Sequence, residues 1–232
     1  MLDNKIKHSY LFCLIEKDGP DKEEIEGKNL FPENLFSSTT IKNLKLWFGA
    51  PAANKDIKSL LGIKIKYINY ITGEKKETNY QGAPIEGMDV DVQELEIGEG
   101  DHLSKFYIGF EEYITHLKFK TIKGQQIEVG VLNESCEKQS VQEINGDNNI
   151  ILNIKGYFSK NGIRAIGCSY ISFKDFCFIR WIDLLRIRHK LKNNEEKKKY
   201  EEKYNEFSEI SKTVYRTCAL SDVCFSTILK YV

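Results

Sequence analysis

The sequence is poor in proline and has no long run of apolar residues. Only 4 of its 232 residues are proline. No stretch approaches the ~20 consecutive apolar residues that a membrane-spanning helix needs. The most apolar stretch, Phe176 to Ile187, contains Arg180, Asp183 and Arg186. We therefore expect no membrane span.

The sequence also lacks an excess of charge of either sign. Its 34 Lys and Arg residues balance 34 Asp and Glu residues, which gives a formal net charge of zero. Proteins that bind nucleic acid by neutralising phosphates carry many more cations than anions. We therefore expect no nucleic-acid partner, and no net charge opposes self-association.

Features of secretion are missing as well. The first seven residues include the polar Asp3, Asn4, Lys5 and Lys7, and the apolar stretch Tyr10–Ile15 is too short for the core of a signal peptide. The six cysteines show no paired short spacing, which predicts free thiols in a reducing compartment. We expect an intracellular protein that is not secreted, in the cytoplasm, the cytoskeleton or cilium, or an organelle. The cysteines are Cys13, Cys136, Cys168, Cys177, Cys218 and Cys224.

Three regions differ in composition. Residues 1–40 contain turn signals such as Asp18-Gly19-Pro20 and are predicted to be an irregular N-terminal extension. Residues 41–174 hold most of the glycines and alternate in hydrophobicity with a period of two. Residues 175–232 contain neither Gly nor Pro and are predicted to be a helical C-terminal extension.

The middle region is predicted to be β-rich. Between Tyr113 and Thr121, apolar and polar residues alternate as in a half-buried strand. Short turns separate the segments and leave no room for helical crossovers, which predicts an antiparallel sandwich, barrel or prism. The predicted strands are 63–71, 75–80, 90–97, 103–110, 113–121, 125–131, 149–158 and 165–173.

The C-terminal region predicts a long helix with a possible break near Asn193-Asn194, and a short second helix from Ser221. An apolar stripe at helical spacing covers its first half and resumes at Tyr200. Its basic residues fit either a solvated helix face or a surface for anionic lipid, acidic protein or RNA. A helix this long overhangs its own domain. We therefore expect contacts with other protein subunits, through Trp181, Arg186, Arg188, Tyr200, Tyr204 and Phe207.

No catalytic constellation is recognisable. The four histidines lack metal-ligand spacing, and His116 falls on the polar face of a predicted strand, where we expect it to be solvated. Cys168 alternates with apolar residues and is predicted to be a buried, inert thiol. Neither a phosphate-binding Gly-rich loop nor Gly-x-Ser-x-Gly is present. We expect no enzyme, no bound metal and no cofactor.

Four segments, in this order along the chain, resemble those of jacalin-related lectins over about residues 45–173. The family's fold is a β-prism I of three four-stranded antiparallel Greek-key sheets. The resemblance therefore implies a mainly β fold, to which residues 175–232 add the predicted α-helical C-terminal extension. The segments are Leu61-Gly62-Ile63-Lys64-Ile65-Lys66-Tyr67 with Thr72-Gly73-Glu74, Val92 to Ser104, Tyr113 to Gly124, and Ile154 to Gly167.

The resemblance also implies a carbohydrate site. Family members bind mannose- or galactose-type sugars without a metal, through Gly-x-x-x-Asp placed just before Ala-Ile-Gly. Here Gly162 matches the glycine, but Arg164 stands where the aspartate should be, so a hydrogen-bond donor replaces an acceptor. Gly49 matches the family's first loop. The degenerate candidate site is Gly49, Asn161, Gly162 and Arg164.

Together these features predict a non-catalytic structural subunit of a large intracellular assembly, either cytoskeletal, axonemal or organellar. The jacalin-like domain would be a scaffold, and residues 1–40 and the C-terminal helix would contact other subunits. The alternative is an active soluble lectin whose altered loop, with Asn161, Gly162 and Arg164, still binds carbohydrate.

Overall fold

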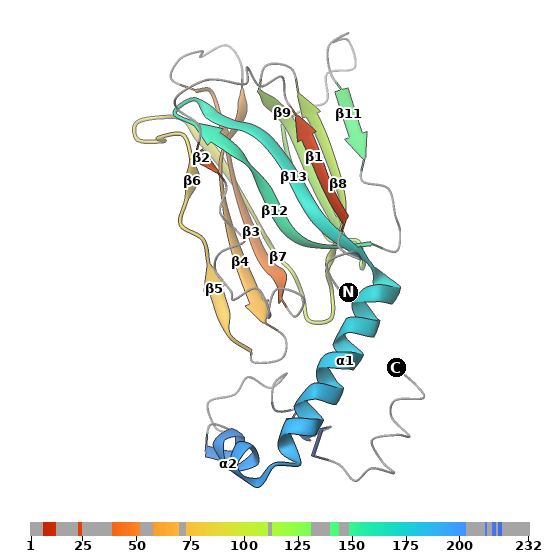
Figure 1. Ribbon diagram of the computed structural model, residues 1–232. Helices are drawn as coiled ribbons and strands as arrows, with labels where there is room; N and C mark the ends of the chain where they lie inside the picture. Colours follow the sequence, from red (N-terminus) through yellow and green to blue (C-terminus); the bar gives the residue numbers. More distant parts are fainter. Residues whose placement is uncertain are drawn as a thin grey trace.

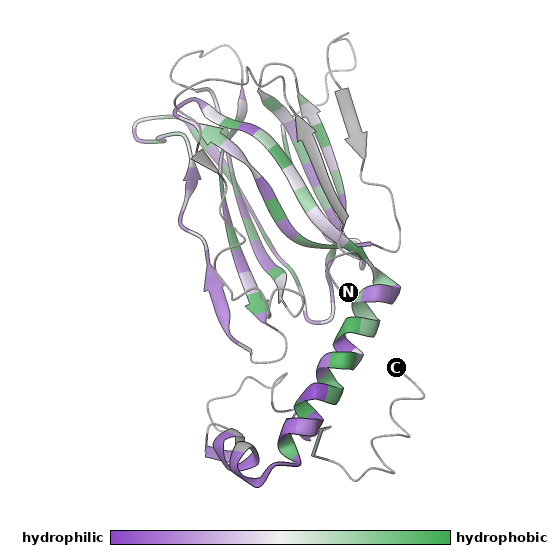
Figure 2. Cartoon of the chain, viewed as in Figure 1, coloured by the Kyte–Doolittle hydropathy of each residue, from purple (hydrophilic) through white to green (hydrophobic). Residues whose placement is uncertain are grey.

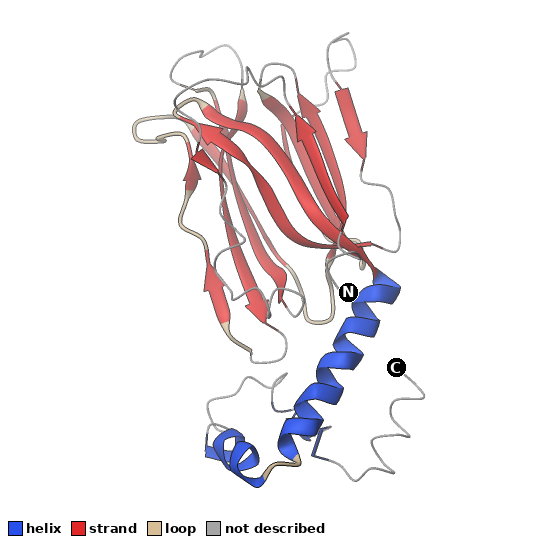
Figure 3. Ribbon diagram, viewed as in Figure 1, coloured by secondary structure: helices blue, strands red, loops and turns tan. Residues whose placement is uncertain are grey.

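The described part of the chain is built from three antiparallel sheets followed by two helices (Figures 1 and 3). This computed structural model confirms the mainly β fold with a helical C-terminal extension, and three antiparallel sheets around a shared core are the arrangement of a β-prism. The structure describes residues 7–12, 23–24, 39–51, 58–69, 73–110, 113–130, 140–143, 149–202, 212, 215–216 and 218–219.

The first sheet joins the two ends of the β region in the order β1-β13-β12-β2. β1 (Lys7–Phe12) and β2 (Glu23–Glu24) flank the hairpin of β12 (Asn149–Ser159) and β13 (Gly162–Ser172). Residues 1–40, predicted to be irregular, therefore contribute two strands. Their partners come from the far end of the chain, which local sequence patterns do not reveal.

The second sheet has the order β10-β9-β8-β11. Its strands are β8 (Leu103–Phe110), β9 (Ile114–Thr121), β10 (Gln126–Gly130) and β11 (Ser140–Glu143). β8, β9 and β10 lie where the sequence predicts them. His116, however, is only 1% exposed, so the prediction of a solvated histidine is wrong.

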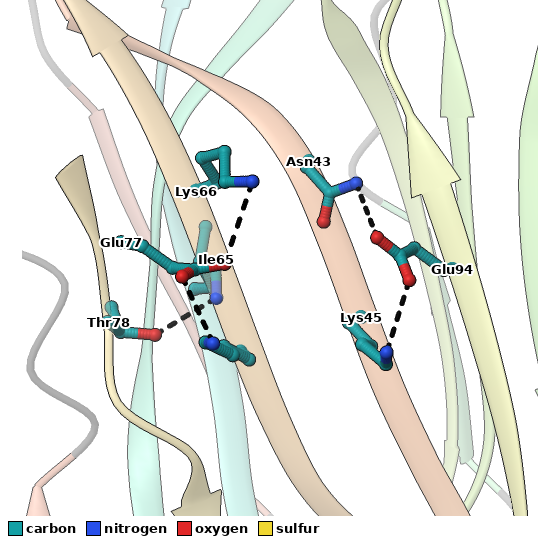
Figure 4. Close-up of polar contacts among 8 residues, drawn as sticks. Asn43, Lys45, Ile65, Lys66, Glu77, Thr78 and Glu94 are labelled. Atoms are coloured by element: carbon teal, nitrogen blue, oxygen red, sulfur yellow. Dashed lines mark hydrogen bonds and ion pairs between the residues drawn. The ribbon is translucent and has the colours of Figure 1, made fainter. Parts of the chain in front are cut away.

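The third sheet differs in one detail from the four strands expected. β4 (Ser59–Asn69), β3 (Thr39–Gly49) and β7 (Val90–Glu96) are continuous, but two short strands, β5 (Lys75–Glu77) and β6 (Gln81–Gly82), share the outer edge of β4. Between them, the backbone N–H of Thr78 donates to the carbonyl of Ile65 at 2.9 Å. The Thr78 hydroxyl accepts from the Ile65 N–H at 2.9 Å, so a side chain replaces one rung of the ladder (Figure 4).

The inward-facing side chains of all three sheets form one apolar core. Along the strands, hydrophobic and hydrophilic residues follow one another in short succession (Figure 2). Phe106 and Phe119 stack at its centre, with ring centroids 4.9 Å apart. Tyr67, from the third sheet, donates from its hydroxyl to the Asn153 amide oxygen of the first sheet at 2.6 Å. Burial raises the pKa of this phenol well above its usual range.

The helical region starts where β13 ends. α1 (Phe173–Leu191) is capped by Ser172, whose hydroxyl accepts from the Asp175 N–H at 3.1 Å and donates to the Asp175 carboxylate at 2.8 Å. α2 (Asn194–Glu202) follows a break at which the Asn193 side chain accepts from the Glu195 N–H at 2.9 Å. The break was predicted near this point. The second helix predicted from Ser221 lies outside the described residues.

α1 is held to the prism through its first two turns. Phe176 and Ile179 pack against Ile150, Leu152 and Ile171 of the first sheet. Beyond these turns the helix leads away from the sheets toward α2 (Figure 1).

Candidate functional sites

The β12–β13 turn contains Asn161 and Gly162 of the degenerate carbohydrate site that the sequence resemblance implies. Only Lys160 and Asn161 separate the paired Ser159 and Gly162, and the Asn161 N–H donates to the Ser159 hydroxyl at 3.3 Å. Gly162 has φ +126°, and a Cβ there would lie 2.9 Å from the Leu60 carbonyl oxygen. The turn is therefore short and packs directly on β4.

Arg164, near the start of β13, reaches Tyr113, which immediately precedes β9. Its guanidinium carbon lies 4.6 Å from the ring centroid of the buried Tyr113, and its Nε donates to the Ser159 hydroxyl at 3.4 Å. The guanidinium provides no hydrogen-bond acceptor for a sugar hydroxyl. It has a structural cation–π contact instead.

Gly49 lies at the same end of β4 as Gly162. A Cβ on Gly49 would meet the Asp89 carbonyl at 2.8 Å and Leu61 at 3.3 Å, and one on Gly162 would lie 3.7 Å from the Leu61 Cα. The structure thus brings Gly49 and Gly162 to one strand end, where both are glycine because neighbouring backbone leaves no room for a side chain.

The outer face of the third sheet has a polar network that the sequence analysis missed (Figure 4). Glu94 on β7 accepts from Asn43 at 3.0 Å and pairs with Lys45 at 3.2 Å, and these contacts lower the pKa of its carboxyl. Glu77 bridges Lys64 and Lys66 of β4 at 3.0 and 3.8 Å. The sequence signal for this face is the alternation of Asn43, Lys45 and Trp47 with the buried Leu44 and Leu46 along β3.

An aromatic pair continues this face. The rings of Trp47 and Tyr80 meet edge to face with centroids 4.9 Å apart. Tyr80 lies over Gly62, where a Cβ would come within 2.3 Å of its ring, and its hydroxyl donates to the Ala83 carbonyl at 2.7 Å. Burial raises the pKa of Tyr80 to about 12, so this phenol stays protonated. Its hydrogen bond to Ala83 stabilises the edge of β4 that β5 and β6 share.

The candidate partner-binding residues of α1 fall into two groups. Trp181 is half-buried and stacks on the exposed Phe178 with centroids 6.0 Å apart, and the exposed Arg186 pairs with Asp183 at 3.3 Å. Arg188 is only 9% exposed and donates to the Cys218 carbonyl at 2.8 Å. The prediction that Arg188 contacts a partner is therefore corrected: its charge binds the chain's own backbone. The Tyr200 side chain and all of Tyr204 and Phe207 lie outside the described residues.

A buried histidine that the sequence analysis did not single out lies where α1 joins the prism. His102 is 8% exposed, its Nδ1 lies 3.2 Å from the Thr40 hydroxyl, and its ring meets Phe176 at 5.0 Å. Burial, followed by the charge of Arg180, lowers its pKa to about 4. At neutral pH the imidazole is therefore uncharged.

The remaining candidate features are a cysteine, possible metal ligands and a possible membrane span. Cys168 is 1% exposed, and burial raises the pKa of its thiol to about 12, which confirms the prediction of an inert cysteine. Within the described ranges, no three His, Cys, Asp or Glu side chains converge as metal ligands. No helix among the described residues is both long and apolar enough to cross a bilayer.

Comparisons with solved structures find similarity to lectins at low sequence identity. Solved structures similar to it include the following three. A prostate-specific WGA16 glycoprotein lectin is 18% identical and covers 67% of this chain and 94% of its own, with a TM-score of 0.46. A Malaysian banana lectin is 14% identical, and the match covers 71% of this chain and 96% of the lectin, with a TM-score of 0.47. A mannose binding jacalin related lectin from Ananas comosus is 12% identical, and the match covers 57% of this chain and 83% of the lectin, with a TM-score of 0.42.

All three of these solved structures are lectins. At these identities the likeness concerns the fold alone. No protein-family model matches the chain, and no curated protein matches it.

Proposed function

We propose that this protein is a non-catalytic docking subunit of an intracellular assembly, with the prism as a rigid scaffold. One observation carries the proposal: the guanidinium of Arg164 lies on Tyr113 at the place where a sugar-binding relative would present a carboxylate. Because a carboxylate accepts sugar hydroxyls and a guanidinium only donates, this end of the prism is poorly equipped to bind carbohydrate.

The arrangement of α1 supports a docking role. The helix is anchored by Phe176 and Ile179, yet it presents the exposed Phe173 and Phe178, at 45% and 46% exposure, on other parts of its surface. Large apolar side chains that stay exposed on an otherwise packed element are typical of contact surfaces. The assembly we propose is cytoskeletal, axonemal or organellar, and the free thiols Cys168, Cys177 and Cys218 fit a reducing compartment.

A pull-down with the full chain from a native extract tests the proposal, together with a glycan array on the same preparation. We expect specific co-purifying proteins, loss of some of them with Phe178→Ser, and no glycan binding above background. Glycan binding that is abolished by Arg164→Ala would instead establish the protein as a lectin. A preparation that retains neither proteins nor glycans would also contradict the docking role.

A further inference from the structure

We propose that a cavity between the C-terminal end of α1, α2 and the segment around Cys218 binds a phosphate group, either free or as the headgroup of a lipid. This C-terminal cavity has a volume of about 110 Å³. Because a single water needs only ~10–15 Å³ of such space, the cavity has room for a group of several non-hydrogen atoms. It lies at the end of α1 that leads away from the prism (Figure 1), and the site is independent of the docking role proposed above.

The cations of the C-terminal cavity come from both helices. Arg188 and Lys192, the residue at which α1 ends, are four positions apart and line the same side of that helix. Lys197 lines the cavity from α2. Of the described residues that form the lining, none is Asp or Glu. Three positive charges around one small space attract an anion with more than one negative charge.

Helix dipoles alone do not explain this convergence of cations. A dipole favours cations in the last turn of a helix, which accounts for Arg188 and Lys192. Near the start of a helix it opposes a cation, yet Lys197 is the fourth residue of α2. Its pair with Glu201 is long, at 3.8 Å, and the two side chains are 48% and 54% exposed, so the pair contributes little. An anion in the cavity can therefore compete for the Lys197 ammonium at small cost.

Arg188 gives the cavity its strongest anion-binding group. It is only 9% exposed, and its hydrogen bond to the Cys218 carbonyl, at 2.8 Å, orients the guanidinium. A guanidinium presents its N–H donors in one plane and matches two oxygens of a phosphate. Because water screens a buried charge less than an exposed one, Arg188 attracts an anion more strongly than a surface lysine does.

The rest of the described lining is neutral. Leu191 and Cys218 pack together, with Tyr215 beside them. Burial raises the pKa of the Cys218 thiol to about 11, so no thiolate repels an incoming anion at neutral pH. The Tyr215 hydroxyl donates to Glu201 at 3.2 Å, which links this wall to α2. Apolar walls limit the access of water and strengthen hydrogen bonds between the cations and an anion.

The number of charges favours a phosphate over a carboxylate. A phosphate monoester carries a charge of about −1.5 to −2 at pH 7 on three acceptor oxygens, whereas a carboxylate carries one charge on two oxygens. Three cations around one cavity match the phosphate. The other arginines of α1 are engaged elsewhere, because Arg186 pairs with Asp183 and Arg180 lies over the ring of Phe176. The basic cluster of α1 is therefore concentrated at the cavity and does not form one continuous surface.

Isothermal titration calorimetry of the full chain with inorganic phosphate tests the site, at constant ionic strength because salt screens charges. We expect saturable binding with a Kd of about 1 mM or tighter, and binding of acetate at least about tenfold weaker. The cavity variant, Lys192→Gln with Lys197→Gln, keeps Arg188 and should weaken phosphate binding by about tenfold or more. The control, Lys190→Gln with Lys198→Gln, removes the same charge at exposed positions outside the lining and should bind phosphate like the wild type.

Vesicle flotation distinguishes the two sources of the phosphate group. Phosphatidylcholine vesicles with phosphatidic acid present a phosphate monoester, whereas those with phosphatidylserine present negative charge and only a phosphate diester. Binding to the phosphatidic acid vesicles alone, lost in the cavity variant, assigns the group to a lipid. Binding of inorganic phosphate without binding to vesicles assigns it to a soluble ligand.

Four outcomes overturn the proposal. The first is a wild type that binds neither inorganic phosphate nor phosphatidic acid vesicles, and the second is acetate binding as tight as phosphate binding. The third is a control variant that loses as much affinity as the cavity variant, because the attraction would then belong to the helix surface as a whole. The fourth is equal binding to both kinds of vesicle, which would indicate a response to membrane charge without recognition of a phosphate monoester.

Discussion

Arg188 in the last turns of α1 donates a hydrogen bond to the carbonyl oxygen of Cys218, 30 positions further along the chain, at 2.8 Å. The Cys218 thiol lies 3.5 Å from the Leu184 carbonyl, so residue 218 is attached to α1 at two points. Ile187 and Leu191 pack beside them. This small cluster holds Cys218 and Tyr215 on the second half of α1.

Replacement of Arg188 by Met should loosen this attachment. A hydrogen bond from a buried charged group contributes about 1.5–3 kcal/mol, and Met keeps the aliphatic packing without the donor. We expect faster amide exchange and proteolysis beyond Leu191, with little change in the prism. Lys190→Met, at an exposed neighbouring position, is the matched control, and equal effects from both variants would contradict this role for Arg188.

Arg164→Ala should destabilise the β12–β13 turn by about 0.5–2 kcal/mol, because the cation–π contact with Tyr113 is lost. The free energy of unfolding from denaturant titration measures this loss. Lys160→Ala, in the exposed part of the same turn, should change stability by less than about 0.5 kcal/mol. A stable Arg164→Ala protein would mean that the contact with Tyr113 contributes nothing.

Gly130→Ala should cost several times more stability than Gly124→Ala. Both glycines have positive φ, +80° and +91°, so each alanine is strained by about 1–3 kcal/mol. At Gly130 the new Cβ would also lie 1.9 Å from the Thr115 carbonyl and 2.9 Å from Phe48, whereas nothing lies within 4 Å at Gly124. Thermal unfolding of the two variants separates backbone strain from steric overlap, and equal losses would argue against the close approach at Gly130.

His102 should make the protein less stable in mild acid. Its pKa is lowered to about 4 in the folded protein from 6.5, so below pH 6.5 the unfolded chain binds a proton that the folded chain does not. Its stabilising effect is therefore complete above pH 6.5 and is lost as the pH falls toward 4, by up to about 3 kcal/mol. Asp101, Lys123 and Arg180 contribute to the local field.

Unfolding titrations between pH 7 and pH 4 measure this dependence. His102→Gln should flatten the stability profile over that range, at some loss of stability at pH 7. His189→Gln, at an exposed site, should leave the profile unchanged. A wild-type profile that is flat between pH 7 and pH 4 would contradict the burial of a neutral imidazole at the α1 junction.

Most strands of the prism were predictable, because short turns separate them and strands such as β9 and β10 alternate between buried and more exposed residues. β3 was not predicted, and a β-bulge explains the failure: between Ile41 and Asn43 the register shifts, so the alternation breaks before Leu44 and Leu46 resume it. β1 and β2 depend on partners far along the chain, and their own sequences contain no comparable signal.

The candidate site was predictable only in part. The sequence places Arg164 where a carboxylate is expected, but its contact with Tyr113 joins segments 51 positions apart along the chain and has no local signature. Arg188 belongs to a basic cluster in the sequence, yet the carbonyl that it binds belongs to a distant segment. The position of a charge on a helix can be predicted, whereas its burial depends on tertiary packing.

The pairing of Lys7 with Tyr170 sets an order of events during synthesis on the ribosome. β13 emerges long after β1, so the first sheet cannot close until nearly all the β region has left the exit tunnel. Until then one edge of the nascent prism lacks its neighbour. Chaperones that shield unpaired strands should therefore bind the growing chain late, and release it only once α1 begins to emerge.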